Sequence, residues 1–134
     1  MAWNWQVSGW PDFRYDEEAL APLEQRFLMS SGEVLGAVHH VNPSERDQLR
    51  IDLLSDEAMK TSAIEGEMLD RRSVQSSLRR HLGLEPDSYP NKPREQGVAE
   101  MMVDVYSTFA EPLEHGTLFR WHEMLLAFDK RLEA

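Results

Sequence analysis

The sequence predicts an all-α protein: a bundle of about five helices in a single domain, residues 1–134, preceded by an irregular, aromatic-rich N-terminal segment. Apolar residues recur at helical spacings of three, four and seven along most of the chain. These stretches are bounded by residues that favour helix starts and stops, such as Asp, Gly and Pro. We find no paired strand patterns, no glycine-rich phosphate loop and no internal repeat. Helix packing is therefore the expected architecture.

The first fifteen residues are aromatic and lack helical periodicity. Trp3 and Trp5 alternate as in a short strand, and Trp10-Pro11 turns the chain. Trp and Phe bury much apolar area, so we expect residues 1–15, which include Phe13, to form an aromatic strap over the helical body. An aromatic ligand-binding patch is the alternative.

The first two predicted helices cover residues 16–40 and 44–66. Asp16 is a favourable N-cap, and two glutamates follow it in the first turn. Pro43 lies beyond the end of the first helix, and Ser44 opens the second. Each helix carries one apolar side.

Three further helices are expected in the second half of the chain. Asp70 to Leu82 is the third, with Gly83 as its stop. A loop with three prolines leads to the fourth, from Arg94 to about Phe109. The fifth begins near Leu118 and runs to the end.

The overall charge argues against several classes of partner. The formal net charge is −10, from 14 basic and 24 acidic residues. A nucleic-acid surface needs a basic stripe, so we expect no nucleic acid, and a helix-turn-helix DNA binder is disfavoured. An anionic membrane surface is disfavoured for the same reason. The charge suits a partner with a basic pocket, or simply solubility.

Residue usage and the N-terminus indicate a cytoplasmic protein. The chain has no cysteine, which excludes disulfides and thiolate chemistry. No apolar run approaches the roughly 20 residues that span a bilayer. The N-terminus has neither a basic n-region nor an apolar h-region, so we expect no secretory signal.

Most candidate chemical groups have ordinary structural explanations. No two of the five histidines form a His-x-x-x-His pair, so we expect no metal site. Arg71, Arg72, Arg79 and Arg80 give one helix a basic stripe, which we interpret as a solvated face, with a phosphate site as the alternative. We find no serine nucleophile motif and no acid–base pair, so this chain alone is not expected to be an enzyme.

Glu65 is the position that folding alone does not explain. It stands at the end of the second predicted helix, directly before Gly66. The helix dipole leaves partial negative charge there, so a carboxylate costs about 0.3–1 kcal/mol. Thr61 and Ser62 lie four and three residues earlier, hence on the same helix face. The Glu65 carboxylate either binds an arginine through two hydrogen bonds or is exposed to water.

The segment from Thr61 to Gly66 is similar to the inhibitory motif of Fic proteins, Ser/Thr-x-x-x-Glu-Gly/Asn, with Thr61, Glu65 and Gly66 at the matching positions. Further segments resemble the N-terminal domain of class II Fic proteins over nearly the whole chain. These are Trp3-Asn4-Trp5-Gln6, Trp10-Pro11-Asp12-Phe13-Arg14-Tyr15, Ser73-Val74-Gln75-Ser76-Ser77-Leu78-Arg79-Arg80-His81-Leu82-Gly83-Leu84 and Leu118-Phe119-Arg120-Trp121-His122. The catalytic signature His-Pro-Phe-x-x-Gly-Asn-Gly-Arg is absent from this sequence.

The resemblance implies a regulatory role. Fic enzymes transfer AMP from ATP to hydroxyl side chains of target proteins, and the inhibitory glutamate of class II members pairs with the core arginine that holds the ATP γ-phosphate. Carried over, Glu65 is the inhibitory residue, Thr61 and Gly66 shape the helix that presents it, and Ser62 supports it. The full-length enzyme is expected to use ATP and a divalent metal; this chain holds no cofactor.

The resemblance also implies the partner. It is a Fic catalytic core, on the same or a separate chain, and a homodimer is a further arrangement. The alternative function is a stand-alone, antitoxin-like helical module that caps a separate Fic chain.

Overall fold

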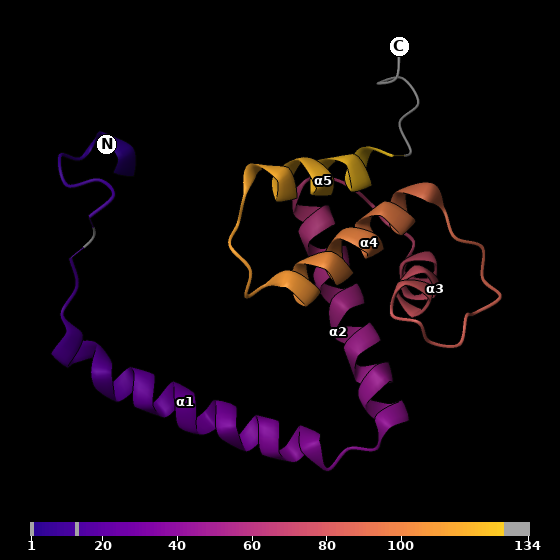
Figure 1. Ribbon diagram of the computed structural model, residues 1–134, viewed down its shortest axis with the longest axis horizontal. Coiled ribbons are helices and arrows are strands. Elements are labelled where there is room, and N and C mark those ends of the chain that lie inside the picture. The colour runs from indigo at the N-terminus through magenta and orange to yellow at the C-terminus, as the bar shows by residue number, and fades with distance from the viewer. Residues whose placement is uncertain (1, 13, 128–134) are drawn as a thin grey trace. The chain divides into compact units, whose positions relative to one another are not determined.

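Five α-helices and one short 3₁₀ helix make up the regular structure of residues 2–12 and 14–127, the part that the computed structural model describes (Figure 1). No strand occurs among these residues, which confirms the predicted all-α class. The chain divides into two compact units, Met1–Asn42 and Pro43–Ala134. None of the described helices is both long and apolar enough to cross a membrane.

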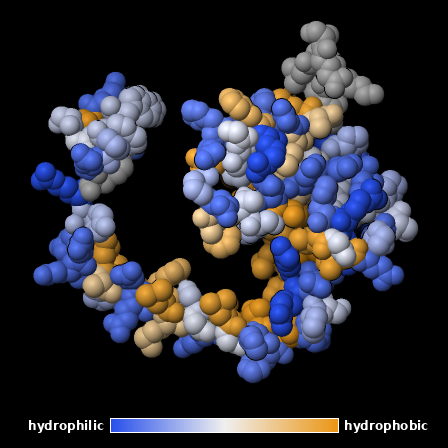
Figure 2. All heavy atoms as spheres, in the orientation of Figure 1, coloured by the Kyte–Doolittle hydropathy of each residue, from blue (hydrophilic) through white to orange (hydrophobic). Residues whose placement is uncertain are grey.

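The first unit contains the 3₁₀ helix η1 (Asn4–Gln6) and the helix α1 (Glu17–His39). The predicted N-cap is confirmed, because the Asp16 side chain accepts a hydrogen bond from the backbone N–H of Ala19 at 3.0 Å. None of the residues of α1 is buried. Figure 2 shows hydrophobic side chains at its surface.

The expected strand at Trp3 and Trp5 is wrong. The backbone between them forms η1, in which Gln6 N–H donates to the Trp3 carbonyl at 2.9 Å. Trp3 N–H also donates to the side-chain oxygen of Gln6 at 2.8 Å, and the two indole rings stack with centroids 5.0 Å apart. A 3₁₀ turn satisfies these backbone groups locally, whereas a strand needs a neighbour.

The aromatic strap stays a prediction, as does the single domain. Trp3, Trp5 and Trp10 are all exposed in the structure. Two residues of the predicted strap, Met1 and Phe13, lie outside the described part of the chain.

The second unit holds four helices in which α4 is central. They are α2 (Pro43–Ile64), α3 (Arg71–His81), α4 (Pro93–Thr108) and α5 (His115–Leu126). Helix α4 packs against each of the other three, and α3 also packs against α2. The apolar core comes from α2, α3, α4 and the connection before α3. Its buried members are Leu54, Ala58, Leu69, Val74, Leu78, Val98, Ala99 and Met102.

Serines let α3 pack closely on its neighbours. Ser73, Ser76 and Ser77 are buried together with Val74 and Leu78. Two of these hydroxyls bond to the chain that leads into α4: Ser73 Oγ accepts from Lys92 N–H at 2.8 Å, and Ser76 Oγ donates to the carbonyl of Tyr89 at 3.1 Å. The third, Ser77 Oγ, has no hydrogen-bond partner among the described residues.

The starts of α2 and α5 differ from the sequence prediction. Helix α2 begins at Pro43 instead of Ser44, because proline suits the first helical position, where its missing N–H would be unpaired anyway. Helix α5 begins at His115, three residues before the first periodic apolar residue, Leu118, since its first turn is polar. The predicted continuation of this helix beyond residue 127 lies outside the described residues.

Candidate functional site

Helix α2 ends in a Schellman motif that directs the chain away immediately after Glu65. Gly66 has φ +81°, a left-handed conformation that favours glycine. Its N–H donates to the carbonyl of Ala63 at 3.1 Å, and the N–H of Glu67 donates to the carbonyl of Ser62 at 2.8 Å. The last regular helical residue is Ile64, so Glu65 lies one position beyond the helix.

The structure brings three of the four sequence-predicted site residues to one pocket. Thr61, Ser62 and Glu65 all line it, from the same side of the α2 end. The fourth, Gly66, does not line the pocket. Its left-handed backbone conformation forms the turn that ends α2. The Thr61 hydroxyl donates to Glu57 one turn earlier, at 3.3 Å, which fixes its orientation along α2.

The pocket has apolar walls and a volume of about 280 Å³. Helix α4 supplies Val98, Met101 and Met102, and the end of α5 supplies Leu125 and Leu126. Nothing in the sequence pattern marks these two methionines as site residues. In the structure Met101 is half-buried, so part of its surface faces the pocket instead of the core.

Charged groups line the same pocket. Arg94 binds the carboxylate of Glu67 in an ion pair. The side chain of Glu65 is exposed and makes no hydrogen bond or ion pair with any residue in the described ranges. Among the described residues that line the pocket, two carboxylates and one guanidinium leave a negative balance, which favours a cationic group beside Glu65.

Helices α4 and α5, which supply the apolar walls, approach each other closely at Gly97. A Cβ at this position would stand 2.1 Å from the backbone oxygen of Met124. Real Cβ atoms do not tolerate such a distance, so only glycine allows the two backbones to lie this near. Leu125 and Leu126 directly follow this contact, which fixes where they meet the pocket.

Asp70 anchors the chain just after the site. One carboxylate oxygen accepts from the N–H groups of Arg72 at 3.0 Å and Ser73 at 3.4 Å, which caps α3. The other accepts from the Tyr89 hydroxyl at 2.9 Å and from the Lys92 ammonium at 2.8 Å. The Lys92 and Tyr89 hydrogen bonds lower the pKa of Asp70 from 3.8 to about 2.

A buried glutamate completes this anchor. Glu95, in the first turn of α4, is only 4% exposed and accepts a hydrogen bond from Asp70 N–H at 2.9 Å. The sequence offered no sign of this role, because a glutamate in a first helical turn is usually a solvated residue that complements the helix dipole. The contact joins α4 to the segment that follows Glu65.

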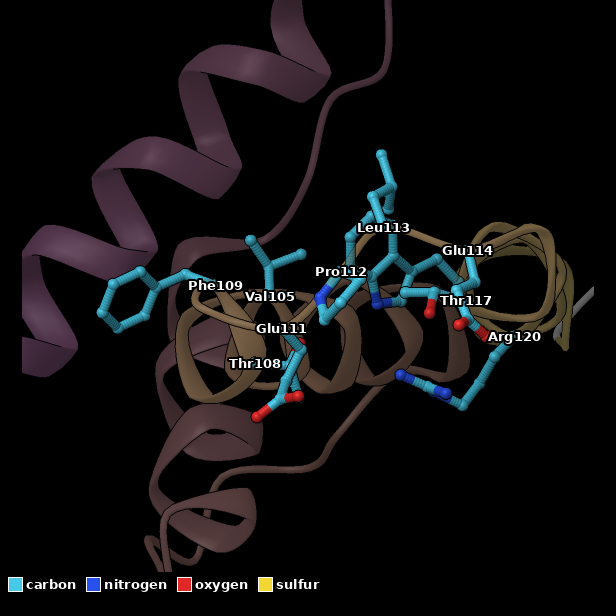
Figure 3. A pocket seen from close by; sticks show the side chains of 10 residues that line it. Val105, Thr108, Phe109, Glu111, Pro112, Leu113, Glu114, Thr117 and Arg120 are labelled. Carbon is cyan, nitrogen blue, oxygen red and sulfur yellow. The ribbon is translucent and has the colours of Figure 1, made fainter.

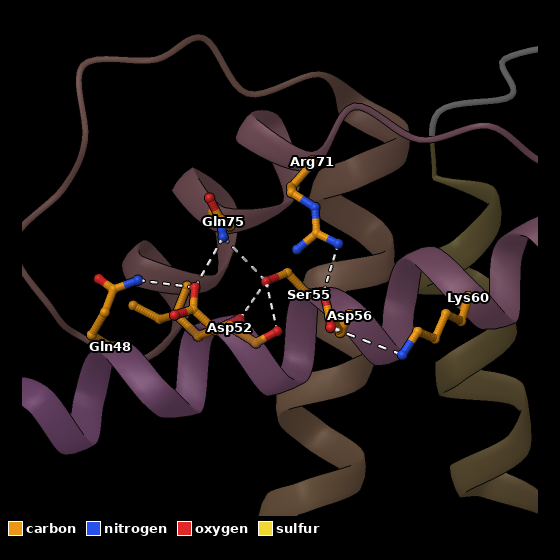
Figure 4. Close-up of polar contacts among 8 residues, drawn as sticks. Gln48, Asp52, Ser55, Asp56, Lys60, Arg71 and Gln75 are labelled. Carbon is orange, nitrogen blue, oxygen red and sulfur yellow. Dashed lines mark hydrogen bonds and ion pairs between the residues drawn. The ribbon is translucent and has the colours of Figure 1, made fainter.

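Polar side chains also join α2 to α3 (Figure 4). Arg71 binds Asp56 at 2.6 Å, and its hydrogen bond and charge lower the pKa of that carboxyl. Gln75 donates to Asp52 at 3.2 Å and to Ser55 at 3.4 Å. Part of the basic stripe on α3 is therefore occupied by neighbouring groups, and these contacts hold the helix that presents Glu65.

A second cavity, of about 580 Å³, lies where α4 leads into α5 (Figure 3). Arg120 and Trp121, two of its lining residues, are held by Asp104, which accepts from Arg120 at 2.8 Å and from the indole N–H at 2.6 Å. These hydrogen bonds lower the pKa of Asp104. His122 is exposed and does not line this cavity.

Comparison with known proteins identifies a family. No curated protein matches the chain. Residues 3–84 match the family described as "Domain of unknown function (DUF4172)". The matched region includes α2 and all of Thr61, Ser62, Glu65 and Gly66, whereas the walls from α4 and α5 lie beyond it. The chain therefore belongs to the DUF4172 family.

Proposed function

We propose that this chain is the autoinhibitory, regulatory domain of a Fic protein adenylyltransferase, and that Glu65 is the inhibitory residue. The observation that carries the proposal is the presentation of Glu65. Its carboxylate is exposed at the end of α2, beside a pocket, and no residue of the described chain binds it. The Schellman motif at Gly66 fixes the end of the helix that presents it.

Electrostatics indicate the kind of group that Glu65 meets. A carboxylate at a helix C-terminus is unfavourable by about 0.3–1 kcal/mol. A guanidinium offsets this cost, because it forms two parallel charge-assisted hydrogen bonds with a carboxylate. In the proposal this guanidinium belongs to the arginine of the Fic core that otherwise holds the γ-phosphate of ATP.

Inhibition then follows from a misplaced nucleotide. Phosphoryl-type transfer depends on positioning and on stabilisation of developing charge. When Glu65 occupies the arginine, the γ-phosphate loses its ligand and ATP is held unproductively. ATP and a divalent metal bind to the core in this account. The pocket of this chain does not fit a triphosphate, because Glu65 and Glu67 line it and Arg94 is already bound to Glu67.

The same contact serves two arrangements. The core lies on the same polypeptide, or the chain caps a separate Fic protein in the manner of an antitoxin. The second arrangement is supported by residues 43–134, which have an apolar core of their own. Addition of the isolated chain to a core that lacks it distinguishes the two, because only a stand-alone module inhibits efficiently in trans. We place either arrangement in the cytoplasm.

The test is AMP transfer by the protein that joins this chain to its Fic core. Glu65→Gly is expected to raise self-modification or target modification above the wild-type level. Glu85→Gly, which removes an exposed acid in the loop before α4, serves as the matched control and is expected to leave transfer unchanged. Equal transfer by wild type and Glu65→Gly would show that Glu65 is not inhibitory.

A further inference from the structure

We propose that the pocket beside Glu65 receives an apolar side chain from the same partner segment that brings the arginine to Glu65. Recognition would then have two points, an apolar anchor and a guanidinium. This inference rests on the proposed function and deepens it. It adds a second requirement for the partner, which the carboxylate alone does not impose.

The size and walls of the pocket suit such an anchor. Its volume of about 280 Å³ exceeds the roughly 150 Å³ of an apolar cavity that accepts a benzene ring. Val98, Met101 and Met102 form one wall, and Leu125 and Leu126 form another. Leucine, methionine and phenylalanine side chains fit this space, and the methionines adapt their shape to any of them.

The charges around the pocket determine what accompanies the anchor. Glu67 is bound by Arg94, so its charge is balanced within the chain. Glu65 has no such partner among the described residues, and it lines the same pocket. A cation close to the anchor completes the site, whereas an anion would meet Glu65 directly. The net charge of −10 also attracts a basic partner at long range.

The shared lining fixes how near the two partner groups must be. Because Glu65 itself lines the pocket, the guanidinium and the apolar anchor must lie within a side chain's length of each other. On a partner helix this corresponds to positions three or four residues apart. The occupant is therefore a cationic, amphipathic segment of a protein.

A small-molecule probe tests the two-point site in the full chain without its partner. The probe is n-butylguanidinium, and methylguanidinium is its control, because the two share the cation and differ by three methylenes. Amide chemical shifts of Ser62, Glu65 and Leu126 report binding. Burial of three methylenes predicts that n-butylguanidinium binds about tenfold or more tightly than methylguanidinium. Equal affinities would overturn the proposal.

A substitution that fills the pocket tests whether the apolar chain of the probe binds there. Ser62→Phe adds a ring at the pocket lining and leaves Glu65 in place, while Ala63→Phe adds the same ring at the next position, which is exposed and outside the lining. Ser62→Phe is expected to abolish the advantage of the butyl chain, and Ala63→Phe to retain it. If Ser62→Phe fails to fold, Leu126→Ser at the end of α5 serves as the second pocket variant for the same measurement. Retention of the butyl advantage in both pocket variants would overturn the assignment.

The same variants separate this inference from the proposed function. In the protein joined to its Fic core, Ser62→Phe is expected to raise AMP transfer and Ala63→Phe is not. If Glu65→Gly raises transfer while n-butylguanidinium gains nothing over methylguanidinium, the pocket assignment falls and the proposed function stands. If Glu65→Gly changes nothing while Ser62→Phe removes the butyl advantage, the pocket binds as proposed and the regulatory function falls.

Discussion

Glu65 and Glu67 line the same pocket, two positions apart, yet only Glu67 has an ion-pair partner within the described chain. Arg94, from the first turn of α4, binds Glu67. The turn at Gly66 separates the two carboxylates. Glu67 binds Arg94 of α4, whereas the Glu65 side chain is exposed at the end of α2. Within the described chain, Glu65 is therefore the carboxylate of this pocket that a partner cation can bind.

The close approach of α4 and α5 predicts that Gly97→Ala destabilises the second unit. The added methyl would meet the Met124 backbone, which cannot rotate away as a side chain would. Overpacking of this kind costs about 1–3 kcal/mol. Urea unfolding measures the change in free energy.

Gly116→Ala is the control for that substitution. A Cβ at Gly116 meets no atom within 4 Å, so the variant is expected to be neutral or slightly more stable, because alanine favours the helix. Equal destabilisation by both substitutions would show that the α4–α5 contact is not the cause.

The low pKa of Asp70 predicts acid-sensitive stability. Because its pKa is about 2 in the folded chain against the usual 3.8, its contribution is complete above 3.8 and is lost as the pH falls towards 2. Asp70→Asn keeps the cap of α3 but loses the charge that binds Lys92. The variant should be less stable at neutral pH and lose less stability in acid, as measured by urea unfolding across that range.

Glu85→Gln controls for the general effect of removing a carboxylate. Glu85 is exposed and no described residue binds its side chain. The stability of the Glu85→Gln variant should therefore depend on acid pH as that of the wild type does. An Asp70→Asn protein with the same acid dependence as wild type would contradict the role of the Asp70–Lys92 contact.

Two buried serines of α3 are predicted to respond in opposite ways to alanine. Ser73→Ala leaves the Lys92 N–H without its acceptor, which costs about 1–3 kcal/mol. Ser77→Ala removes a buried hydroxyl that has no partner among the described residues, so stability should stay the same or rise by about 0.5 kcal/mol. Thermal unfolding compares the two; an equal loss in both would contradict the hydrogen-bond assignment.

Local signals in the sequence are sufficient to predict where most of the helices lie. Asp16 caps α1 and Asp70 caps α3, as their residue types predict. Gly66 and Gly83 both adopt positive φ just past a helix, because only glycine enters that region without strain. Each of these features depends on a few adjacent residues, which explains why pattern reasoning succeeds for them.

Long-range contacts could not be read from the sequence. Arg94 and Glu67 are 27 positions apart, and no spacing rule connects them. The burial of Glu95 depends on α4 lying against the start of α3, and the pocket walls depend on how α5 returns to α4. The site residues on α2 were therefore predictable as one face, while the cavity beside them was not.

The rate of AMP transfer by the protein joined to its Fic core shows whether Glu65 is inhibitory when Glu65→Gln is compared with Glu85→Gln. Both changes keep the side-chain shape and remove one charge. Loss of a charge-assisted hydrogen bond is worth about 1.5–3 kcal/mol, so Glu65→Gln should raise the rate of AMP transfer about tenfold or more. Glu85→Gln should leave the rate near wild type, because Glu85 is exposed and lies outside the lining of the pocket. A wild-type rate in Glu65→Gln, or an equal rise in both variants, would contradict the account.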